Sequence, residues 1–495
     1  MPSTAFKDTQ DTQLGRGITR LTTDKKDLSG AYLLREGLDA FAARMVLADA
    51  AERSLDIQYY IWHNDAVGKL FAGAVLRAAE RGVRVRVLLD DIQLEGLDRE
   101  LAALDSHPNI EIRIFNPFVL RQARVLEMIF SFSRINRRMH NKSFTADSQI
   151  TIVGGRNIGD EYYDFHKEVN FDDLDILTIG PVVEEVSDAF DQYWNSEFAI
   201  PVAGFIKKVS QLDLGQLRTS LAGHDAKMQV SEYMKAVRES VFLVSLNKKT
   251  LPIAWGKAYV VYDEPEKINH DSQDTRTHLS RKVAPFVNDS HSELILISPY
   301  FIPGENALAR LQKLIARDVR VRVLTNSLAS TDVSIVYAGY MPYRVPLLQA
   351  GVELYESKPS NNIPRKRKKY KLGSSSRASL HTKLYIFDRQ KIFVGSYNLD
   401  PRSSKLNTEL GIVFENEKLA ETLALWWDEH IDAWAYKLVL AEEHGTEEDE
   451  ETEYSIEWLA EENGKQQRYK VEPHAGFWRR FGIDFMSILP IEDQL

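Results

Sequence analysis

One eighteen-residue pattern occurs twice in this chain, and it restricts the fold more than any other feature. The first copy reads His140-x-Lys142-x4-Asp147-x6-Gly154-Gly155-x-Asn157. The second copy reads His381-x-Lys383-x4-Asp388-x6-Gly395-Ser396-x-Asn398. An imidazole, an ammonium group and a carboxamide recur at matching offsets. The duplication predicts two homologous halves that each bring one half-site to a shared ligand.

Each copy of the pattern also predicts a β-hairpin. Apolar and β-branched runs at 143–146 and 149–155 flank Asp-Ser, and runs at 384–387 and 391–396 flank Asp-Arg-Gln. Histidine and lysine two positions apart on a strand point to the same face. The small residues Gly155 and Ser396 would let a ligand approach the backbone closely, so we count them as phosphate-binding positions.

The similarity of the two halves extends upstream of the motifs. Residues 54–88 and 292–324 each read as strand, amphipathic helix and strand, which is a βαβ unit. The fold class is therefore α/β, in two homologous halves with mixed sheets. The expected division is an N-terminal extension (1–27), a first half (28–205), a polar linker (206–227), a second half (228–440) and an acidic C-terminal part (441–495).

Composition narrows the class of protein. The 495 residues carry a net charge of −10, which disfavours a general nucleic-acid binder. No run of eighteen apolar residues occurs, so no transmembrane helix is expected, and the N-terminus does not read as a signal peptide. Without cysteine there is neither a disulfide framework nor a cysteine-based zinc site.

The duplicated pattern resembles the HKD signature of the phospholipase D superfamily. From about Leu28 to Leu440, and again in the closing LPIEDQL, the chain is most similar to bacterial cardiolipin synthases of the C type. The resemblance implies two α/β/α sandwich halves, related by a pseudo-twofold axis, with the active site at their interface.

Phosphodiester exchange needs a nucleophile, a proton donor and cations for the phosphate oxygens. On the resemblance, we assign His140 as the nucleophile that forms a phosphohistidine and His381 as general acid and then base. The reverse order stays open, because the halves are pseudo-symmetric. Lys142, Lys383, Asn157 and Asn398 would bind the non-bridging oxygens. With that set of donors we expect no metal and no cofactor.

Four carboxylates are candidates for supporting roles. Asp147 and Asp388 are the motif acids and are grouped with the catalytic residues, although they could instead support the fold. Asp173 in FDDLDI and Glu409 in NTELGI lie at matching places in the two halves. A catalytic imidazole needs a carboxylate on its far nitrogen, and we expect Asp173 and Glu409 to fill that role.

Three stretches could face a membrane. Residues 117–138 alternate five arginines with apolar residues and predict a basic amphipathic helix. A basic run covers 365–371, and Phe and Trp accompany Arg in 477–489. A helix packed on the core and a solvated charged loop are the alternatives for these stretches.

The expected activity is phosphatidyl transfer between two glycerophospholipids, which makes cardiolipin. Phosphatidylglycerol is the expected acceptor, and the donor is phosphatidylglycerol or phosphatidylethanolamine. The expected location is peripheral, on an anionic bacterial inner membrane, with no nucleic-acid partner. A phospholipase D-type hydrolase that releases phosphatidic acid is the first alternative. A nuclease and an inactive membrane-binding scaffold are the others.

Overall fold

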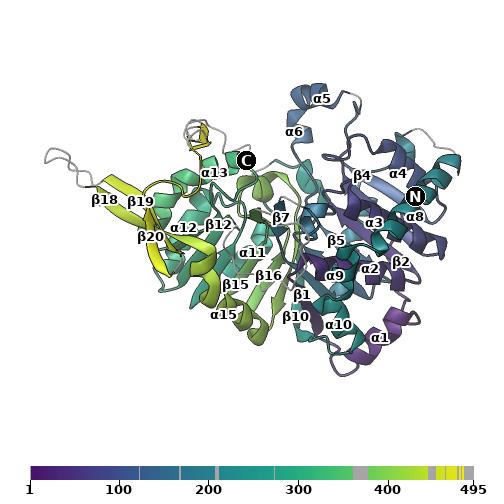
Figure 1. Ribbon diagram of the computed structural model, residues 1–495, viewed down its shortest axis with the longest axis horizontal. Coiled ribbons are helices and arrows are strands. Elements are labelled where there is room, and N and C mark those ends of the chain that lie inside the picture. Colours follow the sequence, from purple (N-terminus) through teal and green to yellow (C-terminus); the bar gives the residue numbers. More distant parts are fainter. Residues whose placement is uncertain are drawn as a thin grey trace.

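A continuous sheet of eighteen strands runs through both halves of the computed structural model (Figure 1). The structure describes residues 2–121, 123–166, 169–206, 211–271, 274–359, 377–443, 453–462, 464–476, 479–480 and 482–483. Helices cover both faces of the sheet, so each half is a three-layer α/β/α sandwich. The predicted fold class is confirmed.

The first half contributes eight strands to the sheet. Their spatial order is β1 (Ser29–Leu34), β8 (Asp175–Ile179), β6 (Ile150–Gly154), β5 (Ser143–Ala146), β2 (Ser54–Tyr59), β3 (Arg84–Asp90), β4 (Ile110–Phe115) and β9 (Ala199–Pro201). Strands β2, β3 and β4 are mutually parallel, as the predicted βαβ unit requires, and the other pairings are antiparallel.

The second half repeats this order. It runs β10 (Ala254–Tyr262), β17 (Leu410–Glu415), β16 (Lys391–Gly395), β15 (Leu384–Phe387), β11 (Glu293–Ile297), β12 (Arg320–Asn326), β13 (Glu353–Ser357) and β18 (Ala435–Glu443). Strands β19 (Glu453–Glu462) and β20 (Lys465–Tyr469) extend the far edge. The predicted boundary at residue 440 is therefore wrong, because it falls inside β18.

Equivalent strands of the two halves meet at the centre of the sheet. Strands β1 and β10 pair antiparallel, with Gly30 opposite Trp255, so the halves are related by a pseudo-twofold axis. A separate two-stranded sheet also crosses between the halves. It pairs β7 (Val169–Asp172) in parallel with β14 (Arg377–Leu380).

Helices lie on both faces of the sheet. In the first half they are α1 (Gln13–Thr22), α2 (Gly37–Ala50), α3 (Ala66–Glu80), α4 (Asp98–Asp105), α5 (Arg124–Phe130), α6 (Phe132–Ile135), α7 (Val182–Asn195), α8 (Gln211–Gln229), α9 (Glu232–Arg238) and α10 (Val241–Asn247). In the second half they are α11 (Leu279–Asn288), α12 (Gly304–Ile315), α13 (Ser334–Tyr340), α14 (Arg344–Gln349) and α15 (Glu417–Trp434). Among the described residues, no helix is long and apolar enough to cross a membrane.

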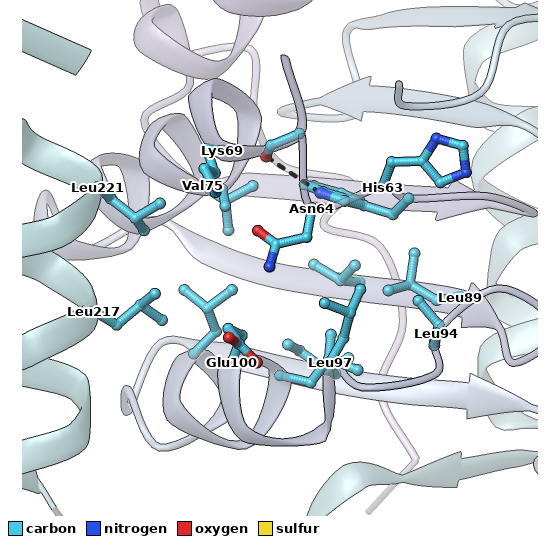
Figure 2. Close-up of a pocket in the computed structure, with 17 residues that line it drawn as sticks. His63, Asn64, Lys69, Val75, Leu89, Leu94, Leu97, Glu100, Leu217 and Leu221 are labelled. Atoms are coloured by element: carbon cyan, nitrogen blue, oxygen red, sulfur yellow. Dashed lines mark hydrogen bonds between the residues drawn. The ribbon is translucent and has the colours of Figure 1, made fainter. Parts of the chain in front are cut away.

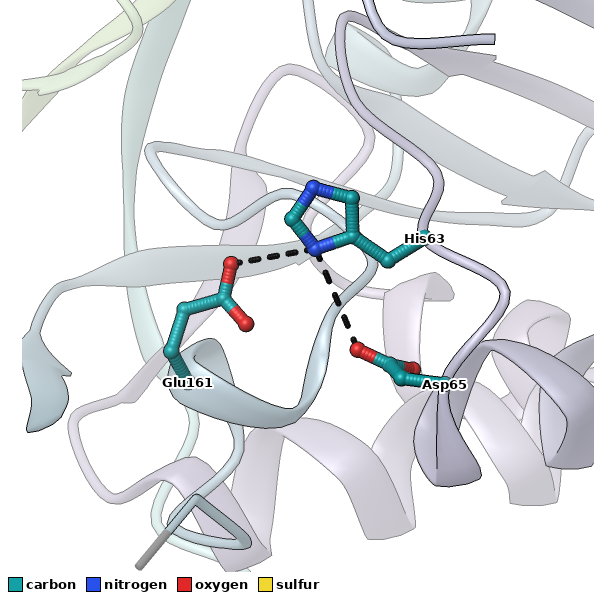
Figure 3. A group of neighbouring side chains, drawn as sticks. All are labelled: His63, Asp65 and Glu161. Atoms are coloured by element: carbon teal, nitrogen blue, oxygen red, sulfur yellow. Dashed lines mark ion pairs between the residues drawn. The ribbon is translucent and has the colours of Figure 1, made fainter. Parts of the chain in front are cut away.

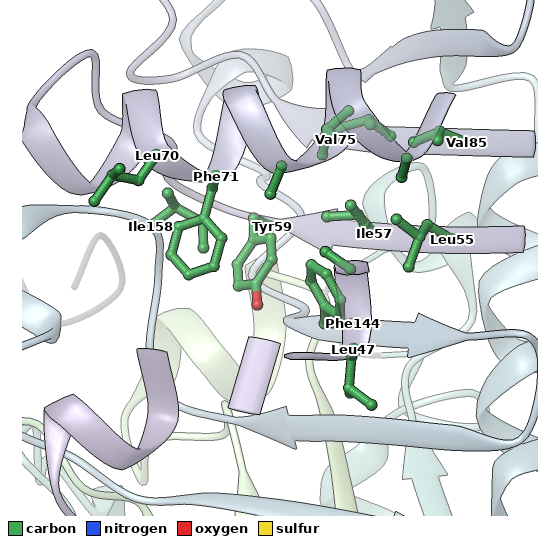
Figure 4. Close-up of a cluster of buried hydrophobic side chains, with 14 of the residues drawn as sticks. Leu47, Leu55, Ile57, Tyr59, Leu70, Phe71, Val75, Val85, Phe144 and Ile158 are labelled. Atoms are coloured by element: carbon green, nitrogen blue, oxygen red, sulfur yellow. The ribbon is translucent and has the colours of Figure 1, made fainter. Parts of the chain in front are cut away.

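Alternation along the central strands separates the two apolar layers. In β11, Leu294 and Leu296 join the core beneath α11 and α12, whereas Ile295 and Ile297 join the core beneath α15. In the first half, side chains of β2 pack with those of α2 and α3, as Figure 4 shows around Tyr59 and Phe71. Successive side chains of a strand point to opposite faces of the sheet, so a strand such as β11 contributes to the apolar layers on both faces.

The linker region differs from the prediction. Residues 211–229 form the helix α8, whose Leu214 and Leu221 are buried against the first half. Side chains of α9 and α10 join the same core, so the first half extends to about residue 253. The polar sequence is the solvent face of a helix, and the boundary predicted at residue 228 is wrong for that reason.

Both chain extensions pack on the halves where they are described. Near the N-terminus, the Ala5 amide donates to Asp191 on α7 at 2.7 Å, and the Thr9 hydroxyl donates to the Asp147 carbonyl. Near the C-terminus, Arg479 donates to the Thr331 carbonyl at 2.9 Å and Ile483 is buried in the second core. The basic run at 365–371 lies outside the described residues, as does most of 477–489.

Candidate active site

The two motif histidines lie where the two halves of the protein contact each other. The His140 amide donates to the Thr408 carbonyl, and the His381 amide donates to the Asp172 carbonyl, each at 2.8 Å. The bridge between Met139 and Thr408 and the pairing of β14 with β7 fix this register. The segment that carries each histidine is therefore bound to the segment that precedes the other half's carboxylate.

As a result, each imidazole faces a carboxylate from the opposite half. His140 Nδ1 lies 2.9 Å from Glu409 Oε2, and His381 Nδ1 lies 2.5 Å from Asp173 Oδ2. All four side chains are buried. A carboxylate on Nδ1 fixes the tautomer and leaves Nε2 for chemistry. Asp173 and Glu409 thus lie where orienting groups are needed, and neither half holds a complete pair.

The carboxyl ends of the parallel strands position both motifs. Asp90 ends β3 and accepts from the Met139 amide at 2.9 Å. Asn326 ends β12 and accepts from the Leu380 amide at 3.1 Å. Sequence reasoning missed both residues. The signal was available, because ligand sites in α/β sheets form at the carboxyl ends of parallel strands.

The motif lysines fold back on their own histidines. Lys142 Nζ donates to the His140 carbonyl and Lys383 Nζ to the His381 carbonyl, each at 2.6 Å. The strands β5 and β15 begin at the predicted residues 143 and 384, so each lysine directly precedes its strand instead of lying within it. Burial lowers the pKa of Lys142 to about 7, and it also lowers the pKa of Lys383. An anionic phosphodiester in the site would favour the charged ammonium groups.

The two histidine–carboxylate pairs differ electrostatically. Burial, reinforced by Lys142 and Lys383, lowers the pKa of His140 well below its usual value, and burial raises the pKa of its partner Glu409 to about 7. Burial also lowers the pKa of His381. The pKa of Asp173 falls nevertheless, because His381 and Lys383 outweigh the effect of burial. The His140 pair favours a neutral imidazole, and the His381 pair keeps an ionised carboxylate.

The motif asparagines are placed differently. Asn157 Oδ1 accepts from the Ile61 amide at 3.1 Å, and its Nδ2 donates to the Tyr162 hydroxyl at 2.9 Å. Asn398 is also buried, but its Oδ1 accepts no hydrogen bond from the described residues. Asn157 is therefore held in place by the fold, while the Asn398 amide retains unused hydrogen-bonding capacity.

Gly155 and Ser396, which were predicted to bind phosphate, both contact the carboxylates that face the imidazoles. A Cβ added to Gly155 would lie 2.2 Å from Asp173 Oδ1, so only glycine leaves room for that carboxylate. The Ser396 hydroxyl donates to Glu409 Oε2 and accepts from the Leu410 amide at 3.0 Å. These small residues admit the carboxylates that hold the two imidazoles.

Asp147 and Asp388 both bind backbone amides, which favours the fold-supporting alternative over a catalytic role. The Asp147 carboxylate accepts from the backbone amides of residues 52–54, with the shortest contact 2.7 Å from Arg53. Asp388 accepts in the same way from the amides of residues 291–293. Each carboxylate fastens the start of a central strand to a hairpin turn, and its oxygens are occupied by backbone donors.

We expect Asp147→Ala to destabilise the protein without a specific effect on chemistry. It removes an acceptor from three backbone amides and puts alanine at a φ of 50°, at a combined cost of roughly 3 kcal/mol or more. The apparent unfolding temperature should fall, whereas kcat per folded molecule should stay within a few-fold. Asp147→Asn, which tolerates this φ, is the milder control. A selective loss of kcat at unchanged unfolding temperature would restore the catalytic assignment.

Aromatic rings surround the imidazoles and were not predicted. The Tyr60 ring meets His140 edge-on with centroids 4.8 Å apart, and Lys142 Nζ lies 5.4 Å from the centre of the same ring. Tyr162 and Phe171 contact His381, with centroids 5.4 Å and 5.1 Å away. Tyr60 directly follows β2, so the strand-end rule would also have found it. The rings exclude water from the two histidines.

A second cluster of titratable groups has a structural explanation. His63 Nδ1 lies 3.3 Å from Glu161 and 3.9 Å from Asp65 (Figure 3). The hydrogen bond with Glu161 raises the pKa of His63 to about 9, so the imidazole is a cation at neutral pH. Asp65 caps α3 by accepting from the Gly68 amide at 2.8 Å. These contacts are those of an ion-paired helix cap.

An apolar cavity lies behind the same loop, between α3, α4 and α8 (Figure 2). Its volume is about 70 Å³, and the labelled Leu89, Leu94, Leu217 and Leu221 point into it. None of its lining residues belongs to the duplicated motif. Cavities of this size and polarity are common packing features beneath a helix.

The fold and the crossed histidine–carboxylate pairs define the phospholipase D class of phosphodiester-processing proteins. Residues 46–194 and 284–431 match the family model described as "Cardiolipin synthase, PLD-like domain". The chain belongs to this family of cardiolipin synthase-like, phospholipase D-like proteins.

Individual relatives agree with this assignment. The chain is 39% identical to cardiolipin synthase C of Escherichia coli (strain K12), over 97% of this chain and 99% of the relative. It is 25% identical to cardiolipin synthase B of the same strain, over 79% and 78% of the two chains. In fold it resembles the phosphatidylserine synthase of Haemophilus influenzae, with a TM-score of 0.54 and 11% identity over 83% of this chain and 89% of that one.

Proposed function

We propose that the protein is a cardiolipin synthase that acts by phosphatidyl transfer. His140 Nε2 attacks the phosphorus of a donor glycerophospholipid, and the alcohol headgroup leaves with a proton from His381. His381 then takes the proton of a terminal hydroxyl on phosphatidylglycerol, whose oxygen attacks the phosphohistidine. The phosphorus–nitrogen bond breaks, cardiolipin leaves and His140 is regenerated. Phosphatidylglycerol and phosphatidylethanolamine are the two donors we consider.

The observation that supports this most is the pair of crossed contacts, His140 with Glu409 and His381 with Asp173. Two imidazoles fixed by carboxylates supply the nucleophile and the proton carrier that a two-step exchange requires. The similarity to cardiolipin synthase C over nearly the whole chain directs this chemistry to glycerophospholipids.

The electrostatic difference between the pairs supports the assignment of roles. A nucleophilic imidazole must be neutral, and the surroundings of His140 favour that form. A general acid must carry a proton, and the ionised Asp173 offsets part of the effect of burial, which lowers the pKa of His381. Lys142 and Lys383 would place positive charge at the non-bridging oxygens, and Nδ2 of Asn398 would add a donor.

The proposed place of action is the surface of a bacterial inner membrane, where these lipids reside. Peripheral attachment to anionic lipid is part of the proposal, and no nucleic-acid partner is included. The two leaving groups, glycerol and ethanolamine, are equally compatible with a site defined by the phosphodiester. The donor lipid is therefore identified from the reaction products.

Product analysis tests the function directly. Purified protein is mixed with vesicles in which phosphatidylglycerol and phosphatidylethanolamine carry different acyl chains, and the lipids are analysed by mass spectrometry. Cardiolipin is the expected product, and its acyl composition identifies the donor. Phosphatidic acid alone would assign a hydrolase, and an unchanged lipid mixture would reject phosphatidyl transfer. A parallel incubation with EDTA should give the same products, because the charged side chains supply the required cations.

The assigned roles predict how each carboxylate affects the pH profile of kcat/KM. Asp173→Asn removes a charge that favours protonated His381, so the pKa of His381 falls further. The alkaline limb, where the general acid loses its proton, should move to lower pH by roughly one to three units. Glu409→Gln should instead move the acid limb to lower pH. Asp173→Glu, which keeps the charge, is the control. An acid-limb shift in Asp173→Asn would reverse the roles of the histidines.

A further inference from the structure

Residues 119–121 and 123–132, here called the apolar projection, expose an unusual amount of apolar surface. Figure 1 shows α5 and α6 standing out from the body of the first half. Phe130 is 82% exposed and Ile129 is 67% exposed. Eight large hydrophobic side chains of this segment are exposed: Val119, Leu120, Val125, Leu126, Met128, Ile129, Phe130 and Phe132. A contiguous patch of this kind marks a surface for an apolar partner.

The charged residues of the same segment point inward, which corrects the predicted basic helix. Arg124 and Arg121 form ion pairs with the buried Asp91 at 2.9 Å and 2.6 Å. Glu127 is buried, where it pairs with Arg134 and accepts from the Leu120 amide at 2.7 Å. The segment is also two short helices instead of one. Arginine thus fixes the projection to the body, and the tip beyond it is apolar.

The base of the projection is bound to the same group that positions His140. Asn116 Nδ2 donates to the carbonyls of Arg134 and Arg137 at 3.0 Å and 2.8 Å. Arg138 lies 3.2 Å from Asp90, whose other oxygen accepts from the Met139 amide next to His140. A surface that engages the tip therefore lies at a fixed position relative to the nucleophile.

We propose that the apolar projection inserts into the interfacial region of a phospholipid bilayer. It would thereby hold the interface between the two halves that contains His140 and His381, here called the seam, close to the bilayer surface. The inference rests on the proposed function, because the substrates of that reaction are lipids of the bilayer. Interfacial insertion suits a segment that presents apolar side chains outward while its charged groups are paired behind them. The contact is hydrophobic, so it does not require anionic lipid.

The test compares binding of the full chain to vesicles of neutral phosphatidylcholine. The variant Ile129→Ser/Phe130→Ser/Phe132→Ser should lose roughly 100- to 1,000-fold in partition coefficient by flotation, since each inserted side chain contributes about five- to tenfold. High salt should not release the wild type. The matched control, Val230→Ser/Leu425→Ser/Val471→Ser, removes exposed apolar groups elsewhere and should bind as the wild type does.

A second variant tests the same contact with little risk to folding. Phe130→Trp should shift its fluorescence emission to the blue when neutral vesicles are added. Turnover of a soluble short-chain phosphatidylglycerol should stay within about twofold in the serine variant, because the seam is intact. Absence of that turnover in the wild type would count against the proposed function alone.

Two outcomes would overturn the inference. Equal binding of the wild type and the serine variant to neutral vesicles, without a tryptophan shift, would show that the tip does not enter lipid. A wild-type dimer that the serine substitutions convert to a monomer, at unchanged vesicle binding, would assign the face to a second copy of the chain.

Discussion

Replacing either His140 or His381 by alanine is expected to lower kcat for phosphatidyl transfer by at least roughly four orders of magnitude. His140→Ala removes the atom that forms the covalent bond, and His381→Ala removes the proton donor for an alkoxide leaving group. The kcat of the double variant should be no lower than that of the less active single variant, because the two groups act in one sequence of steps. Cardiolipin formation from vesicles, measured by mass spectrometry, checks this expectation.

The fold must survive for that result to have meaning. Each imidazole is buried, so its removal takes one hydrogen-bond partner from Glu409 or Asp173 and lowers stability somewhat. Circular dichroism and the unfolding temperature establish that the variants are folded at the assay temperature. His430→Ala on α15, which changes a histidine away from the seam, is the matched control. Retention of more than a few per cent of activity in either single variant contradicts a two-histidine mechanism.

The sequence was sufficient to predict the architecture because its periodicity is local and duplicated. The strand-like runs at 54–59 and 293–297, and the helices that follow them, specify βαβ units from local sequence. The motif residues His140 and His381 were also predictable, because identical spacing in two copies implies a shared ligand.

What could not be predicted depends on contacts between distant segments. The crossing of His140 to Glu409 and of His381 to Asp173 follows from pairing between residues more than 200 positions apart. From the sequence, Gly155 is predicted to lie close to the phosphate. In the structure the Asp173 carboxylate fills the space beside it, which the sequence did not indicate. Short-range patterns carry no information on such neighbours.

The linker predicted around residues 211–227 and the basic helix predicted at 117–138 were wrong for the same physical reason. Charged residues are normally solvated, so 211–227 read as a linker and 117–138 as a basic surface helix. In the first stretch, leucines spaced for a helix are buried against α3 and α4. In the second, Arg121 and Arg124 have a buried carboxylate partner in Asp91, which reverses the polarity of the segment. Composition alone cannot reveal a partner supplied by another strand.

The assigned roles of the two histidines also predict which variant traps an intermediate. In His381→Ala the nucleophile is intact, but an alkoxide leaving group has no proton donor. A phosphatidyl ester of nitrophenol needs no such donor, because nitrophenolate is a stable anion. With this substrate the variant should release nitrophenol in a rapid burst equimolar with enzyme. The second step should then be slow, because the acceptor alcohol has no general base.

The burst should leave a covalent phosphatidyl group on His140. Rapid denaturation followed by peptide mass spectrometry locates the adduct, and His140→Ala should give neither burst nor adduct with the same ester. The neutral state favoured at His140 by burial and by Lys142 and Lys383 supports the proposal that this imidazole is the nucleophile. The mirror-image outcome, with the adduct on His381 in His140→Ala, would assign nucleophile and acid the other way round. Steady release of nitrophenol with neither burst nor adduct would replace the covalent mechanism by direct attack of the acceptor.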